Sequence, residues 1–337
     1  DRPFCLSVSF NVPHGSQTTS MFTDYPEWRE MKRPANENPK LKGTLFYDSL
    51  YRDLDIPLSA DTCTDPYRFI PRFIQDQDAG RRNRTYVYDY DLATCREHHI
   101  RYYQTITGLD HVIGGLRAEL KRRGLADNTI ILYGSDHGLL MGEYGMGGKG
   151  LLYDLASKIP AIIHDPRVPS EQRGRQLDEL VSSLDYPRTI LDYAGIDAPE
   201  IMEGRSLRPL VEGHDVPWRE ELFLESLFTM RDTPFQEGIR GQRWKYIRMY
   251  DGVPRFKEQH VDFNGRQPEF EMLFDLEADP SEHTNLATDS EYADILAEMR
   301  AKTASQSIAI NQRREVYMRV VPPQPRAGPA KKRASER

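Results

Sequence analysis

The chain has 337 residues, of which 38% are hydrophobic and 29% are charged. This composition is typical of globular proteins, and the length suits one large domain or a large domain with a small one. Acidic residues outnumber Lys and Arg by 52 to 45, and the net charge of −7 argues against a basic surface that binds nucleic acid. No apolar run approaches the roughly 20 residues of a membrane span. Three cysteines without CxxC spacing indicate neither a disulfide scaffold nor a zinc site.

The first part of the chain combines short apolar runs with one long amphipathic segment. Residues 4–10 are largely apolar and predict a strand, whereas residues 23–84 are polar and irregular and predict a long excursion over the surface. Apolar residues recur at intervals of three and four over residues 90–123, which predicts a helix that ends at Gly124. The β-branched run at residues 129–133 then predicts a buried strand.

The next segments continue the alternation of strands and helices. Residues 159–164 and 177–182 predict two further strands, and residues 187–194 predict a helix. This alternation indicates an α/β layer architecture with a parallel or mixed sheet. Beyond Pro217 the pattern changes to short strands before a closing helix from Glu291, and we expect the strands at residues 222–224, 237–240, 244–249 and 272–276.

These patterns predict three parts of unequal size. Residues 1–216 are expected to form the larger α/β part, and residues 217–310 a small C-terminal α+β subdomain with an antiparallel sheet. Residues 311–337 are Pro-rich and basic towards their end and are expected to form a disordered tail.

Asp136 and His137 directly follow the strand predicted at residues 129–133. They stand at the edge where open α/β sheets place their functional sites. An Asp oxygen and a His ring nitrogen could together hold a divalent cation at this point. The alternative is an Asp that caps a turn beside an incidental His, because Asp is common in turns. The spacing alone does not decide between the two interpretations.

Lys149 and His14 are two further candidates. Lys149 lies in a Gly-rich segment, GMGGKG, whose small residues would let the backbone approach an anion, but Gly150 breaks the Walker pattern. The alternative is a flexible turn with a solvated Lys. His14 follows the first predicted strand and could donate to an anion or move a proton near neutral pH. A His in such a loop could equally have no chemical role.

Taken together, residues 2–287 resemble the sulfatase family of the alkaline phosphatase superfamily. The resemblance is carried, in chain order, by GSDHG at 134–138, GKGLLY at 148–153, SKIPAII at 157–163, the long block at 181–210, RGQRWKY at 240–246 and FDLEADPSEHTN at 274–285. The block at 181–210 is the most specific of these matches. Tyr144 departs from the pattern, since many relatives have His there, and Lys158 stands where Arg is usual.

The resemblance implies an alkaline-phosphatase-like α/β fold, with a central mixed sheet flanked by helices and a small C-terminal antiparallel α+β subdomain. It implies that Asp136 and His137 are Ca²⁺ ligands. It also implies that Lys149 and His14 are catalytic and substrate-binding residues, with Lys149 on the sulfate oxygens and His14 as a second sulfate contact or leaving-group acid. In such an enzyme a formylglycine diol attacks sulfur while cationic groups stabilise the sulfuryl oxygens.

The nucleophile of the family lies in a Cys/Ser-x-Pro/Ala-x-Arg motif, whose first residue is oxidised to formylglycine. No such motif occurs in the 337 residues. The run from Thr64 to Arg68 has the spacing, but threonine is not a formylglycine precursor. We therefore expect a fragment whose formylglycine belongs to an N-terminal segment upstream. We expect this chain alone to lack sulfatase activity and to bind calcium weakly.

The resemblance implies a sulfuric ester hydrolase that acts on a sulfated carbohydrate. One alternative is a phosphonate or phosphodiester hydrolase of the same superfamily, and another is a non-catalytic protein that binds sulfated glycans. We expect neither a nucleic-acid partner nor a membrane span. The resemblance favours a periplasmic or secreted protein, and the sequence does not indicate an oligomeric state.

Overall fold

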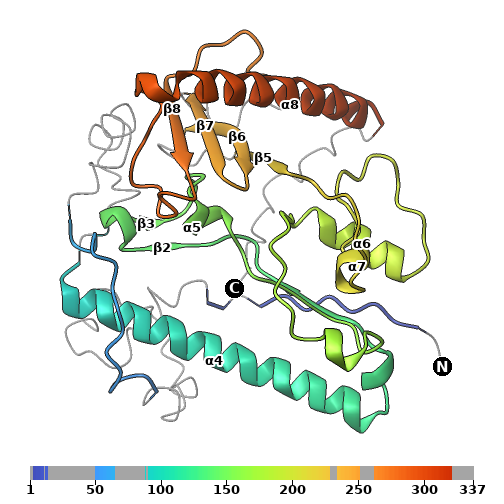
Figure 1. Cartoon of the computed structure of the whole chain (residues 1–337). Coiled ribbons are helices and arrows are strands. Elements are labelled where there is room, and N and C mark those ends of the chain that lie inside the picture. Colours follow the sequence, from blue (N-terminus) through green and yellow to red (C-terminus); the bar gives the residue numbers. More distant parts are fainter. Residues whose placement is uncertain are drawn as a thin grey trace, which may run out of the picture.

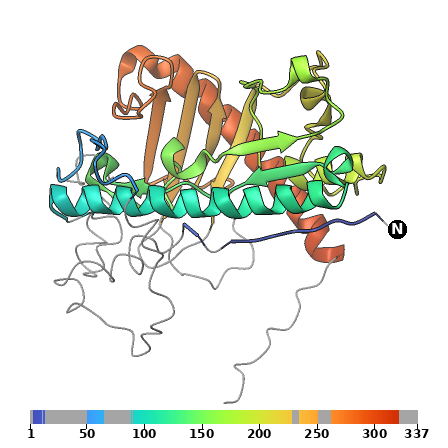
Figure 2. The ribbon, with the colours of Figure 1, turned by 90° about the horizontal axis from the view of Figure 1, so that it is seen from below.

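The structure, a computed structural model, describes residues 3–10, 12–13, 50–64, 88, 90–227, 234–250 and 262–320. Two long helices, α4 (Leu92–Arg122) and α8 (Ala293–Val320), lie on opposite sides of the molecule with the strands between them (Figure 1). The view from below shows α4 in front and the strands and α8 behind it (Figure 2). No helix in the described ranges combines the length and apolar character of a membrane span.

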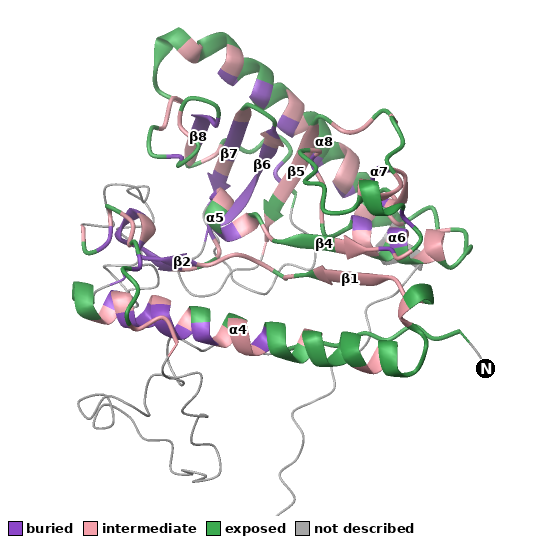
Figure 3. Ribbon diagram, turned by 60° about the horizontal axis from the view of Figure 1, so that its bottom comes forward, coloured by how far each residue is buried: buried purple, intermediate pink, exposed green. Residues whose placement is uncertain are grey.

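Helix α4 confirms the helix expected over residues 90–123. Asp91 caps its start, because its side chain accepts a hydrogen bond from Thr94 N at 2.8 Å. The helix ends before Gly124, whose φ of +69° is readily adopted only by glycine. Its buried residues all lie between Cys95 and Leu109, and the rest of the helix towards Arg122 is mostly exposed, as the burial colours show (Figure 3).

The strands expected at residues 129–133 and 159–164 are observed as β1 (Ile131–Gly134) and β4 (Ala161–His164). They pair antiparallel along their whole length. Neither strand contains a buried residue, so the buried character expected of the strand at residues 129–133 is wrong.

Short elements connect these strands to the rest of the chain. β2 (Leu140–Met141) pairs antiparallel with β3 (Gly147–Gly148), and the 3-10 turn η5 (Glu143–Gly145) closes this hairpin. The helix expected over residues 187–194 is observed as α6 (Asp185–Tyr193). The other short helical elements are η4 (Ala126–Asn128), α5 (Asp154–Ser157), η6 (Ser170–Gln172), α7 (Arg208–Val211) and η7 (Ser290–Tyr292).

Two of the expected strands are wrong. Residues 4–10 form no strand, and their apolar side chains are exposed without a partner strand among the described residues. Residues 177–182 are also irregular, because side chains occupy their backbone acceptors: Leu180 O accepts from Trp218 Nε1 at 2.9 Å. In both segments apolar residues suggested a strand, but a strand also needs a hydrogen-bonded neighbour.

The C-terminal part contains the antiparallel α+β unit that the sequence predicts. Its four strands run in the order β5-β6-β7-β8, and every neighbouring pair is antiparallel. Their bounds are β5 (Glu221–Ser226), β6 (Phe235–Gly241), β7 (Trp244–Tyr250) and β8 (Phe270–Asp275). Helix α8 packs across this sheet (Figure 1). The exact domain boundaries stay predictions.

Both faces of the four-stranded sheet are covered by apolar side chains. On one face Ile239, Tyr246 and Leu273 pack against α8 through Leu296 and Met299. On the other face a second cluster joins strands β7 and β8 to the segment just after β3, through Ile247, Met249, Met272, Phe274, Leu151, Leu152 and Tyr153. Burial of this kind is the dominant favourable contribution to folding. The sheet therefore supports the chain around Lys149.

Helix α8 is longer than expected. It continues to Val320, so the expected disordered tail does not begin at residue 311, and that part of the expectation is wrong. Side chains of this last stretch find acidic partners: Arg313 Nε lies 2.7 Å from Glu203 Oε1, and Arg314 pairs with Glu225. The Pro-rich run that suggested a tail starts only beyond the helix, and residues 321–337 lie outside the described part.

The long block at residues 181–210 owes its pattern to packing. The Asp185 carboxylate is fully buried at the start of α6, accepts from Arg205 N at 2.7 Å and pairs with Arg219 at 2.6 Å. A Cβ on Gly204 would lie 1.9 Å from the carbonyl oxygen of Leu184, so only glycine fits there. These residues bind the loop before α7 to α6.

Candidate functional site

Asp136 and His137 lie in the loop that directly follows β1. The Asp136 carboxylate accepts a hydrogen bond from His137 N at 3.0 Å, which fixes the turn. Gly138 comes next, and a Cβ there would lie 2.1 Å from the carbonyl oxygen of Leu155, so α5 can approach the loop only because residue 138 is glycine. The Gly of the DHG run is therefore required by packing.

The hydrogen bonds of His137 define its tautomer. Nδ1 lies 2.7 Å from Gly138 O, and because a carbonyl oxygen only accepts, Nδ1 carries the proton. Nε2 lies 2.5 Å from Lys149 Nζ and therefore accepts from the ammonium group. Asp136 Oδ2 lies 3.3 Å from the same Nε2 atom. The structure thus brings together three of the four residues that the sequence singles out.

The charges of this cluster act on Asp136. Burial would raise the pKa of its carboxyl, but the charge that the His137 ring carries when protonated, the His137 backbone N–H and the charge of Lys149 hold that pKa below its ordinary value. Asp136 is consequently an anion at neutral pH. A carboxylate oxygen and an imidazole lone pair then lie together beside a cationic group.

This donor set fits part of the shell of a divalent cation. Calcium takes six to eight oxygen ligands and keeps water where the protein offers fewer. Among the described residues no group of three or more His, Cys, Asp or Glu side chains could hold a metal ion. Asp136 and His137 can therefore supply only a fraction of such a shell.

The segment that carries Lys149 is held by buried polar contacts from the C-terminal sheet. Gln236 of β6 is fully buried, and its Nε2 donates to Gly150 O at 2.6 Å while its Oε1 accepts from Leu152 N at 3.1 Å. Both bonds are made inside the protein, where an unpaired backbone group would be costly. Gln236 therefore fixes the backbone one to three residues after Lys149.

A buried ion cluster fixes the next turn of the chain. Lys245 of β7 is fully buried, and its Nζ lies 2.6 Å from Asp154 Oδ1 and 2.6 Å from Glu282 Oε1. Glu282 also accepts from Asp154 N at 2.6 Å, and Arg240 lies 3.1 Å from the second Asp154 oxygen. Burial raises the pKa of Glu282, although Lys245 opposes this effect. Lys245 thus joins the sheet both to α5 and to the loop that follows β8.

Tyr144, where the sequence departs from the expected family pattern, has a structural role. Its side chain is buried in the hairpin turn, its φ is +57°, and its hydroxyl donates to Ser281 O at 2.7 Å. Tyr144 is therefore a structural tie between the hairpin and the loop of Glu282. The hydroxyl is buried, which raises its pKa and keeps it protonated.

His14 lies outside the described residues, as does the predicted excursion at residues 23–84 apart from residues 50–64. Sequence reasoning missed the supporting roles of Gln236, Lys245 and Glu282. Lys245 and Glu282 lie in two of the runs that carry the family resemblance, and this placement could have marked them as important. Gln236 lies outside these runs, and nothing in the sequence pointed to its role.

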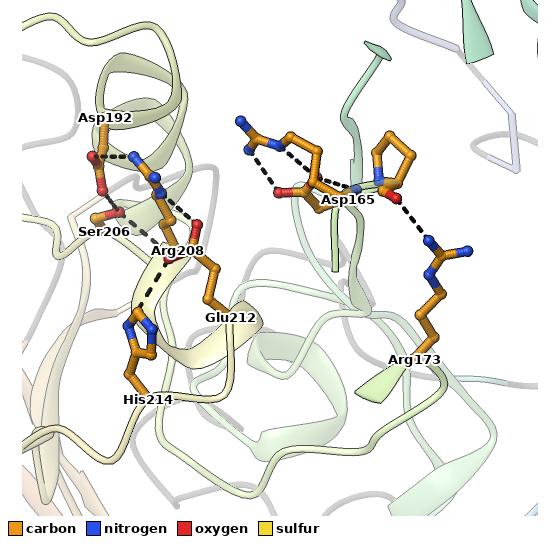
Figure 4. A network of polar contacts seen from close by, with 9 residues as sticks. Asp165, Arg173, Asp192, Ser206, Arg208, Glu212 and His214 are labelled. Carbon is orange, nitrogen blue, oxygen red and sulfur yellow. Dashed lines mark hydrogen bonds and ion pairs between the residues drawn. The ribbon is translucent and has the colours of Figure 1, made fainter. Parts of the chain in front are cut away.

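A second polar network lies around α6 and α7 and contains none of the predicted site residues (Figure 4). Arg208 donates to Glu212 at 2.7 Å and lies 3.4 Å from Asp192. Asp165 pairs with Arg167 at 2.7 Å. Each of these guanidinium groups is matched by a carboxylate, so the network fastens α7 to α6.

Comparison with known families gives two overlapping matches. Residues 1–196 match the family described as Sulfatase, and residues 142–308 match the family described as N-sulphoglucosamine sulphohydrolase, C-terminal. The first match covers the loop with Asp136 and His137 and the Lys149 segment. The second covers the C-terminal sheet and most of α8.

Two curated relatives are similar over most of the chain. An arylsulfatase of Clostridium perfringens is 28% identical over 302 residues, which are 89% of this chain and 52% of the relative. An N-acetylglucosamine-6-O-sulfatase of Bacteroides thetaiotaomicron is 30% identical over 328 residues, covering 87% of this chain and 55% of the relative. The chain thus spans about half the length of the curated relatives it matches.

Solved structures share the fold. A putative sulfatase from Bacteroides thetaiotaomicron is 24% identical with a TM-score of 0.61, over 80% of this chain and 55% of that one. A protein solved with its substrate D-glucosamine-2-N,6-O-disulfate is 26% identical with a TM-score of 0.52, over 66% and 42% of the chains. A phosphonate monoester hydrolase of Agrobacterium radiobacter is 28% identical with a TM-score of 0.54, over 64% and 42%.

Proposed function

Because the chain belongs to the sulfatase family, we propose that its complete gene product hydrolyses a sulfate ester. The observation that carries this proposal is the meeting of Asp136, His137 and Lys149 at the end of β1. An anion-binding Lys beside two potential metal ligands suits an ester with a negatively charged sulfuryl group.

Each side chain has its own proposed role. Asp136 and His137 Nε2 would contribute to a calcium site, and a bound calcium ion would supply positive charge against the sulfuryl oxygens. Lys149 would contact a sulfate oxygen, and its present place beside His137 keeps the ammonium within the site. His14 would be the second sulfate contact or the acid that protonates the leaving alcohol. Formylglycine remains the proposed nucleophile.

The proposed substrate is a sulfated carbohydrate. Two similar proteins support this class: one is named N-acetylglucosamine-6-O-sulfatase, and another was solved with a glucosamine disulfate. Export from the cytoplasm, which the family resemblance favours, belongs to the same proposal. A phosphonate monoester hydrolase is the second candidate, because one solved neighbour with that name is 28% identical.

The test is an assay of the complete gene product, produced in a host that makes formylglycine. We expect turnover of an aryl sulfate and of a sulfated glucosamine, each faster than a phosphonate monoester. Lys149→Ala should lower kcat/KM about 100-fold, as loss of an oxyanion donor does. Lys121→Ala, in the last turn of α4, is the matched control and should leave kcat/KM unchanged.

Two outcomes would contradict the proposal. A preference for the phosphonate monoester would favour the second candidate. Binding of a sulfated sugar without turnover would indicate a glycan-binding protein. A Lys149→Ala variant with normal kcat/KM would leave the sulfatase activity standing but would remove Lys149 from the site.

A further inference from the structure

Two cysteines that are distant in sequence lie side by side near the start of α4. The Sγ atoms of Cys63 and Cys95 are 3.9 Å apart. Both thiols also face one acceptor, since Tyr90 O lies 2.9 Å from the Cys63 Sγ and 3.8 Å from the Cys95 Sγ. The side chains therefore already point towards a common place.

The backbone on both sides holds this geometry. Cys95 is in the first turn of α4, four residues after the cap Asp91, and its side chain is completely buried. Cys63 has a φ of +66°, a left-handed conformation that non-glycine residues rarely adopt. A tight turn holds Cys63 there, because Thr64 N donates to Asp61 O at 2.9 Å and Thr64 Oγ1 donates to the same oxygen at 2.6 Å. Such strain persists only where the surroundings impose it.

The loop that carries Cys63 is fastened to α4 before any covalent bond forms. Arg96 of α4 donates to Arg52 O at 2.9 Å and to Leu54 O at 2.6 Å, and Gln104 donates to Leu50 O at 3.0 Å. Closing the remaining gap between the sulfur atoms to about 2.05 Å therefore needs side-chain rotation and a small backbone adjustment. No large movement of the loop is required.

We propose that Cys63 and Cys95 form a disulfide bond that fastens the loop at residues 50–64 to α4. The co-reactant is a small disulfide such as oxidised glutathione, or a dithiol oxidoreductase in its disulfide form. The Cys63 thiolate attacks this disulfide and releases one thiol, and the Cys95 thiolate then displaces the second thiol from the Cys63 sulfur. The two cysteines are oxidised, the co-reactant is reduced to two thiols, and both cysteine protons end on these products or in solvent.

The order of the two steps follows from exposure. Cys63 is exposed and can meet the co-reactant, whereas Cys95 is buried. Burial, and then the neighbouring Cys63, raise the pKa of the Cys95 thiol to about 12, so its thiolate is scarce at neutral pH. The second step is therefore the slow one, and a mixed disulfide on Cys63 precedes the internal bond.

The bond would restrain a loop that contacts the region around the candidate site. In the same loop the Asp61 carboxylate lies 2.5 Å from His283 Nε2, and Thr62 packs against Gly142 in the hairpin turn that leads to Lys149. A Cys63–Cys95 bond would hold this loop between α4, the hairpin and the C-terminal unit. The linkage is independent of sulfate hydrolysis.

The test uses the full 337-residue chain, equilibrated with oxidised or with reduced glutathione. Each sample is unfolded, its remaining thiols are alkylated, and it is digested without reduction for mass spectrometry. We expect a linked peptide pair that contains Cys63 and Cys95 after oxidation, with Cys5 still alkylated or carrying glutathione. Closing a loop of this length should raise Tm by about 5 °C over the reduced protein.

Matched variants separate the bond from other effects of oxidation. Cys63→Ser and Cys95→Ala should each abolish the linked pair and the Tm difference, whereas Cys5→Ser should keep both. A wild-type chain in which Cys95 stays available for alkylation after oxidation, while Cys63 carries glutathione, would overturn the proposal. So would equal Tm values for the two wild-type samples together with no linked peptide.

Discussion

The four-stranded sheet β5-β8 and the strand pair β1-β4 are both antiparallel, yet they differ sharply in burial (Figure 3). Six of the seven residues of β6 are buried, whereas none of the four in β4 is, and Ile162 is 60% exposed. The four-stranded sheet is covered on one face by α8 and on the other by the segment after β3, so burial stabilises it from both sides. The candidate site joins these two unequal regions.

The difference shows how each half of the site is held. Lys149 lies on a segment that the buried sheet fixes through Gln236 and the Lys245 cluster. Asp136 and His137 depend on β1, on their own loop bonds and on the close approach of α5. The distance between Lys149 and His137 therefore depends on contacts that link the C-terminal unit to the other region.

The largest expected loss of stability comes from a substitution in the ion cluster that joins the two regions. Lys245→Ala would leave Glu282 buried without its cation, or force it to take up a proton, and would leave Asp154 with Arg240 as its remaining cationic partner. Breaking a buried ion pair in this way costs about 3–5 kcal/mol. Urea denaturation of the chain should show a loss of this size in the free energy of unfolding.

A surface Lys of the same unit provides the control. Lys302 pairs with Glu221 and Glu298, but its side chain is 39% exposed. Lys302→Ala should cost about 1 kcal/mol or less. Equal losses for the two variants would show that the buried cluster does not join the regions more strongly than an exposed pair does.

The second prediction compares a buried and an exposed position of α4. Ile100 is completely buried, and Ile106 is 40% exposed in the same helix. Ile100→Ala should cost about 2–5 kcal/mol because it leaves a cavity. Ile106→Ala should change stability by about 0.5 kcal/mol or less. Similar losses in thermal or urea unfolding would mean that the Ile106 side chain is covered in solution.

The sequence predicts those features that depend on local periodicity. Helix α4, strands β1 and β4 and the C-terminal strands follow from apolar spacing and turn residues. The closeness of Asp136 and Lys149 follows from the end of β1 and from the family resemblance. The fourth residue, His14, lies outside the described part and stays a prediction.

The remaining features depend on partners that no local pattern reveals. Lys245 and Glu282 are buried at 0% and 2% exposure, although charged residues normally face water. Their pairing joins β7 to a loop beyond β8. Cys63 and Cys95 likewise meet only because a turn and a helix start are brought together. The false strand at residues 177–182 shows the converse, since its backbone acceptors bond to side chains and not to a neighbouring strand.

The third prediction concerns the contact between β6 and the Lys149 segment. Gln236→Ala would leave Gly150 O and Leu152 N without their buried partners, at a cost of about 1–3 kcal/mol. Gln242 is the control, because its bond to Asp178 O is exposed. Gln242→Ala should change the free energy of unfolding by about 0.5 kcal/mol or less in the same urea titration. A larger loss for Gln242→Ala than for Gln236→Ala would contradict the anchoring role.

The smallest expected effect is a pH dependence at the edge of the C-terminal unit. Asp275 accepts from Arg243 Nη2 at 2.7 Å and from the backbone N–H groups of Glu277 and Ala278 at 3.1 and 3.3 Å. The Arg243 bonds are the main cause that holds the pKa of Asp275 below its ordinary value. The folded state therefore favours the charged form of this carboxyl.

The sign of the pH effect follows from this lowered pKa. The stabilisation is fully present above the unfolded pKa of about 3.9 and is lost as the pH falls through the lower folded pKa. At neutral pH we expect the wild type to be more stable than Asp275→Asn by about 1 kcal/mol. The effect is this small because Arg243 is largely exposed and solvent screens its charge. Other carboxylates titrate in both proteins, so the difference between their urea unfolding free energies isolates Asp275. That difference should shrink as the pH falls from 6 to below about 4. A difference that stays constant over this range would show that the charge of Asp275 contributes nothing to the edge of the sheet.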